Sequence, residues 1–132
     1  MRPPCFVLLA VFLCANLCAE VFTGEKLMQP FVIHGRLSAY NGNPTLRIWI
    51  VGSKRILGIM APEGKEGDLV PKKILDVFDD GQGWFTREMY ADFTVEPLAP
   101  DIQEHMRPVR ILDAKNVVVT SGDTVLWTKK EL

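Results

Sequence analysis

Two stretches in the first half of the chain carry basic and aromatic side chains at alternate positions. Residues 31–40 read FVIHGRLSAY and residues 45–51 read TLRIWIV. Apolar residues alternate with the others, which is the pattern of a strand with one buried face. Guanidinium and aromatic groups on the opposite face can pair with an anion or stack on a sugar or base. The candidate binding residues are therefore His34, Arg36, Tyr40, Arg47 and Trp49.

The same residues also suit a purely structural face. In that interpretation Trp49 packs across the strands onto Tyr40, and the arginines keep the face soluble. The sequence leaves both interpretations open.

Histidines and acidic residues are the other groups with catalytic or metal-binding chemistry. His34 and His105 are the only histidines. A histidine beside a carboxylate can act as a general base, and Asp92 is the candidate partner of His34. The chain has no His-Glu-x-x-His motif and no nucleophile elbow, and residues 76–81 (DVFDDG) lack the spacing of an EF-hand loop. We therefore assign no catalytic residue, and we expect no metal and no cofactor.

The first nineteen residues have the layout of a secretory signal peptide. Arg2 gives a basic start, residues 6–13 form an apolar run, and small residues lead to Ala19. The run is shorter than the roughly 20 residues that span a bilayer, so we expect no transmembrane anchor. Cleavage after Ala19 would release the protein to the periplasm or the exterior. The alternative is lipid attachment at Cys18, although Leu17 before it fits a lipobox poorly.

Cysteine and charge content exclude several classes of function. All three cysteines, Cys5, Cys14 and Cys18, lie in the signal segment. The exported domain is therefore expected to be free of disulfides, thiol catalysis and Cys-ligated zinc. Fifteen Lys and Arg face 16 Asp and Glu, a net charge of −1. Nucleic-acid binding needs clustered positive charge, so we do not expect it.

Residues 20–30 show no clear period and are interpreted as a leader, and residues 31–132 as a single β-rich domain. A short amphipathic helix is predicted over 71–79, with Pro71 in its first turn and Gly81 at its stop. Strands or short β runs are predicted over 31–40, 45–51, 55–59, 89–95, 109–113, 117–120 and 124–128.

Three strands, a helix and then further strands match a small OB-like β-barrel, mainly β with one short helix. A helix-capped β-sandwich is the alternative fold. Gly35, Gly52 and Gly58 lie in or beside strands, where glycine marks bends that curl a sheet, and they favour the barrel.

Residues 31–59, FVIHGRLSAYNGNPTLRIWIVGSKRILGI, resemble a group of small secreted bacterial proteins of unknown function. That group shares the pattern His-Gly-Arg-Leu, Tyr-Asn-Gly, Arg-Ile-Trp, Val-Gly, Arg-Ile-Leu-Gly. Residues 90–95 and 109–119 resemble its later segments. The resemblance implies a bacterial origin and export, and it implies no activity, cofactor or site residue.

The sequence thus predicts an exported, non-enzymatic β-domain that binds a ligand or partner in the cell envelope. The expected partner is a glycan, a peptide or another envelope protein. One alternative is a small exported hydrolase that uses His34 and Asp92. The other is a structural envelope protein with no small ligand.

Overall fold

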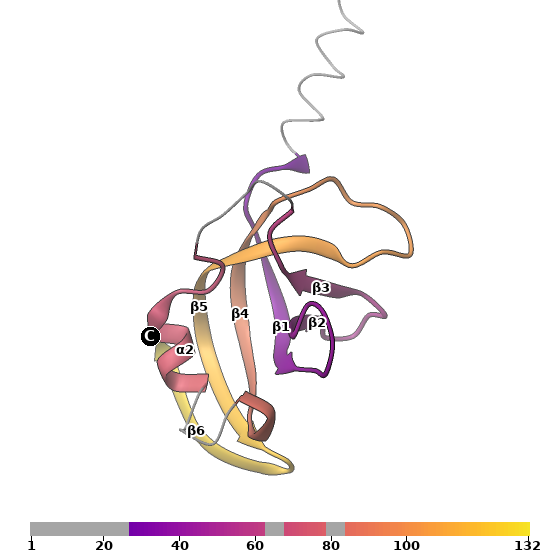
Figure 1. Ribbon diagram of the computed structural model, residues 1–132. Coiled ribbons are helices and arrows are strands. Elements are labelled where there is room, and N and C mark those ends of the chain that lie inside the picture. Colours follow the sequence, from indigo (N-terminus) through magenta and orange to yellow (C-terminus); the bar gives the residue numbers. More distant parts are fainter. Residues whose placement is uncertain (1–26, 63–67, 79–83) are drawn as a thin grey trace, which may run out of the picture.

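The computed structural model describes residues 27–62, 68–78 and 84–132. These residues form one six-stranded sheet with one short α-helix and a single 3-10 turn (Figure 1). The elements in chain order are β1 (Phe31–Ala39), β2 (Leu46–Ile50), β3 (Ile56–Ile59), α2 (Lys72–Phe78), η1 (Trp84–Thr86), β4 (Glu88–Pro97), β5 (Arg107–Ser121) and β6 (Thr124–Glu131).

The strands follow the order β3-β2-β1-β4-β5-β6, and each neighbouring pair is antiparallel. β3 also pairs with the start of β5, in parallel. Five strands therefore form a near-closed ring, and β6 extends the sheet beyond β5. The mainly β class, and the helix between the third and fourth strands, are confirmed.

The alternation predicted for the first strands is confirmed by their burial. Leu37, Leu46 and Ile48 are buried, while Arg47 and Trp49 are half-exposed on the other side. The predicted turn after β1 is present, and the backbone N–H of Tyr40 donates to the carbonyl of Thr45 at 2.8 Å. A local two-residue period was enough to assign these faces because each strand has one side against the core.

The strands predicted over 89–95 and 124–128 are confirmed as β4 and β6, but the region between them differs from the prediction. Residues 109–113 and 117–120 were expected to be two short runs, but they belong to one long strand, β5. Its register against β4 shifts twice, between the partners of Tyr90 and Asp92 and between those of Thr94 and Val95. Such bulges bend a strand without ending it, which lets β5 pair with β3 at its start and with β6 at its end.

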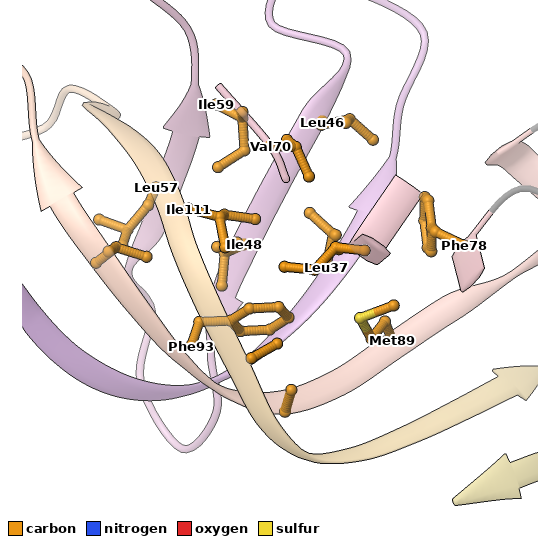
Figure 2. Packing of buried hydrophobic residues seen from close by; sticks show 14 of the residues in the cluster. Leu37, Leu46, Ile48, Leu57, Ile59, Val70, Phe78, Met89, Phe93 and Ile111 are labelled. Atoms are coloured by element: carbon orange, nitrogen blue, oxygen red, sulfur yellow. The ribbon is translucent and has the colours of Figure 1, made fainter. Parts of the chain in front are cut away.

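The core fills the inside of the ring. Leu37, Ile48 and Phe93 are fully buried, and they turn toward the same interior in Figure 2. The predicted helix is confirmed as α2, where Ile74 and Phe78, four residues apart, face the core. This spacing places both side chains on one side of a helix, so a seven-residue helix suffices to extend the core.

Gly35 permits β1 and β2 to approach closely. A Cβ on this residue would collide with the buried side chain of Ile48 and would come within 3.2 Å of the Trp49 carbonyl. The glycine is therefore a packing requirement of the ring.

Several predictions concern residues outside the described ranges. These are the signal peptide over 1–19 with its three cysteines, residues 20–26 of the leader, and the helix stop at Gly81. Within the described ranges, no helix has the length and apolar content to cross a membrane.

Candidate functional site

Cross-strand register brings four of the five candidate residues together on the outward side of β1 and β2. Arg36 lies opposite Trp49, and Ser38 lies opposite Arg47. Tyr40 follows β1 two residues beyond Ser38, which keeps it on the same side. The backbone pairing thus assembles the cluster from two neighbouring strands.

Each arginine of the cluster stacks on an aromatic ring. The guanidinium carbon of Arg36 lies 5.1 Å from the centre of the Trp49 ring, and that of Arg47 lies 4.9 Å from the Tyr40 ring. Both distances are within the roughly 6 Å range of a cation–π interaction. Nη2 of Arg36 also donates to the Tyr40 hydroxyl at 3.5 Å, which links the two stacks. We call these four residues the Arg–aromatic ladder.

Backbone carbonyls fix the outer ends of the ladder. Nε of Arg47 donates to the carbonyl of Pro44 at 3.0 Å, and Nε1 of Trp49 donates to that of Ser53 at 2.7 Å. Ser38, which shares a face with the ladder, is only 5% exposed. The ladder is therefore a packed, ordered surface whose side chains have little rotational freedom left to lose on binding.

Arg36 is the electrostatic centre of the ladder. Burial acts to lower the pKa of its guanidinium, but interactions with the hydroxyls of Tyr40 and Tyr90 and the charge of Glu88 raise that pKa above its ordinary value. Glu88 lies 3.9 Å from Nε, and this buried nitrogen has no hydrogen-bond partner among the described residues. Arg36 thus stays cationic with one donor unused.

His34 lies on the same side of β1 as the ladder but pairs with a different strand. It faces Asp92 of β4 in register, and its Nδ1 lies 2.8 Å from Oδ1 of Asp92. Nδ2 of Asn116 donates to the second carboxylate oxygen at 2.8 Å. The bond from Asn116 and then that from His34 hold the pKa of Asp92 below its usual range.

This His34–Asp92–Asn116 chain has the geometry that orients a general base, because the carboxylate fixes Nδ1 of the ring and no described residue hydrogen-bonds to Nε2. Among the described residues, the surroundings of this chain lack two features of a catalytic site, burial and a hydrogen-bonded nucleophile. The side chains of His34 and Asp92 are 55% and 36% exposed, and no described hydroxyl or thiol hydrogen-bonds to the ring. The described residues also include no group of three potential metal ligands.

Sequence reasoning identified the five candidate residues but missed the partners that complete the site. Tyr90 and Glu88 lie on the outward side of β4, where alternation in residues 88–97 would have placed them. Asn116 adopts a positive φ of 51° beside a register shift of β5. An asparagine between β-rich runs is a signal for such a position, because asparagine tolerates this conformation better than most residues.

No protein-family model, curated protein or solved structure matches this chain. Function is therefore inferred from the residues of this chain, and the resemblance of residues 31–59 to small secreted bacterial proteins stays a prediction.

Proposed function

We propose that this chain is an exported, non-enzymatic binding module whose Arg–aromatic ladder takes a peptide or protein partner in the cell envelope. The export part of the proposal comes from the signal-like layout of residues 1–19. The binding part depends on one observation: two arginine–aromatic stacks lie side by side on a rigid sheet face and remain partly exposed.

The ladder favours a protein surface over a glycan. A sugar ring binds by stacking on an open aromatic face, but a guanidinium already covers one face of Trp49 and one of Tyr40. Trp, Tyr and Arg are the residue types that dominate binding energy at protein interfaces. Val32 is 65% exposed on the same side of β1, so this face offers apolar surface as well as the charged arginines.

We further propose that the near-closed ring is an OB-like barrel. The proposal is supported by the order β3-β2-β1-β4-β5, by the parallel β3–β5 pairing and by the helix between β3 and β4. A helix-capped sandwich would have two separate sheets, whereas the described strands belong to one. Proteins of the OB class bind ligands on the face of their second and third strands, and the ladder shares β2 with that face.

The test is affinity capture from an envelope extract with variants that keep the fold. The purified protein is compared with an Arg47→Gln/Trp49→Phe variant and with an Arg110→Gln/Trp127→Phe variant. The second pair changes the same residue types on β5 and β6. We expect a protein that the wild type and the control capture alike, and that the ladder variant captures at least tenfold less. Equal capture by both variants, each shown by circular dichroism to be folded at the capture temperature, would overturn the proposal in favour of a structural envelope protein.

A second candidate, a small hydrolase, is favoured by the 2.8 Å contact between His34 and Asp92. Its test is hydrolysis of p-nitrophenyl acetate, with His105→Gln as the matched control because His105 is an exposed histidine in a loop. Hydrolysis that falls at least tenfold in His34→Gln and Asp92→Asn, but not in the control, would support an enzyme. Equal rates in all variants would exclude this pair as its catalytic site.

A further inference from the structure

A hollow separate from the ladder lies where β1, β3 and β5 begin and β2 ends. Its volume is about 740 Å³, within the range of small-molecule sites. Phe31, Ile50 and Leu57 contribute apolar surface, and three charged residues share it: Arg55, Asp101 and Arg107. We call this hollow the arginine groove.

Arg107 is a buried cation without a carboxylate partner among the described residues. It is 8% exposed, and its guanidinium lies 5.9 Å from the centre of the Phe31 ring. Nε donates to the carbonyl of Ala99 at 3.1 Å and Nη2 to that of Leu27 at 2.6 Å. These acceptors are neutral, so the charge is held by dipoles alone, and a buried charge in that situation favours an incoming anion. Nη1 donates to no described group.

Arg55 brings a second guanidinium to the groove. It forms an ion pair with Asp101, which lies in the loop between β4 and β5 and is 51% exposed. Burial and then the charge of Arg55 lower the pKa of Arg107, which agrees with two cations in one hollow. The groove therefore holds two guanidinium groups and one carboxylate, which pairs with Arg55 alone, so a net positive charge remains.

We propose that the arginine groove binds a small amphiphilic carboxylate. The carboxylate pairs with the guanidinium of Arg55 and with Nη1 of Arg107, because Nε and Nη2 of Arg107 already donate to the protein. The apolar body lies on Phe31, Ile50 and Leu57. Asp101 is the internal carboxylate that the ligand displaces from Arg55. This site is independent of the partner proposed for the ladder.

The experiment is calorimetric titration of the purified protein with octanoate. We expect one saturable site, with 1-octanol and acetate at least tenfold weaker, because the first lacks the charge and the second the apolar body. Octanol binding as tightly as octanoate would overturn the proposal, as would the absence of saturable octanoate binding.

Substitutions of single residues test whether octanoate binds in the arginine groove. Arg55→Gln should weaken octanoate binding at least tenfold, and Asp101→Asn should tighten it severalfold because the competing carboxylate is gone. Arg110→Gln is the matched control, since it lies on β5 with its own partner Glu96 at 2.9 Å. Arg107→Gln is a less direct test because Arg107 also ties two backbone segments together, so the proposal depends on Arg55 and Asp101. Octanoate binding unchanged in Arg55→Gln would refute it and would leave the ladder proposal untouched.

Discussion

The stack of Arg36 on Trp49 should appear as a measurable coupling energy. The two groups are 5.1 Å apart, and the Arg36 side chain is 28% exposed. A cation–π pair contributes about 0.5–1 kcal/mol when exposed and about 2 kcal/mol when desolvated. This half-buried pair should therefore contribute about 1 kcal/mol.

Single substitutions should be more destabilising than this coupling alone. Trp49→Leu removes the stack and also the hydrogen bond from Nε1 to Ser53, worth about 1 kcal/mol, so its total is about 2 kcal/mol. Arg36→Met removes mainly the stack, because its contacts with Tyr40 and Glu88 are long, at 3.5 and 3.9 Å. In the double variant the stack is lost only once, so the combined loss should be about 1 kcal/mol smaller than the sum.

The wild type, the two single variants and the double variant form a double-mutant cycle. Urea unfolding followed by far-UV circular dichroism would measure the free energy of unfolding of each. The matched control is the cycle of Arg36→Met with Lys72→Met, because Lys72 lies on α2 and pairs with Asp76. The control should be additive within about 0.3–0.5 kcal/mol. A coupling between Arg36 and Trp49 inside that same range would refute the stack as an energetic feature and, with it, the rigidity on which the proposed binding face depends.

Two further predictions concern stability. Asp92→Asn should destabilise the protein at pH 7, and its difference in stability from wild type should shrink as the pH falls below about 4. The reason is that a carboxylate with a lowered pKa stabilises the fold above its unfolded pKa and loses that contribution as it protonates. Urea midpoints at pH 7 and pH 3 measure this difference, and a difference that does not change with pH would contradict the role given to His34 and Asn116. Gly35→Ala should destabilise the folded protein by about 1–3 kcal/mol, since the added methyl overpacks the contact between β1 and β2. Thermal unfolding measures this loss. A melting temperature equal to that of wild type would contradict the prediction and show that the ring can relax around the methyl group.

Much of the candidate site could be predicted because the side of a strand on which a side chain lies is a local property of the sequence. Alternation in residues 31–40 and 45–51 was sufficient to place Arg36, Arg47 and Trp49 on one side of two strands. The continuity of β5 was not predictable in the same way, because its bulges depend on pairing with β4 rather than on composition. The arginine groove had no local signal, since Arg55 and Arg107 are far apart in the chain and belong to no shared pattern.

The sequence by itself determined the mainly β class, the position of the helix and the outward face, because a period of two or of 3.6 residues is set by neighbours in the chain. Only the tertiary structure decided which residues meet. Register places Arg36 opposite Trp49 and His34 opposite Asp92, and the β3–β5 pairing brings the two ends of the near-closed ring together beside Arg107. The physical reason is that strand pairing is a long-range choice, made by the burial of the whole core rather than by any one segment.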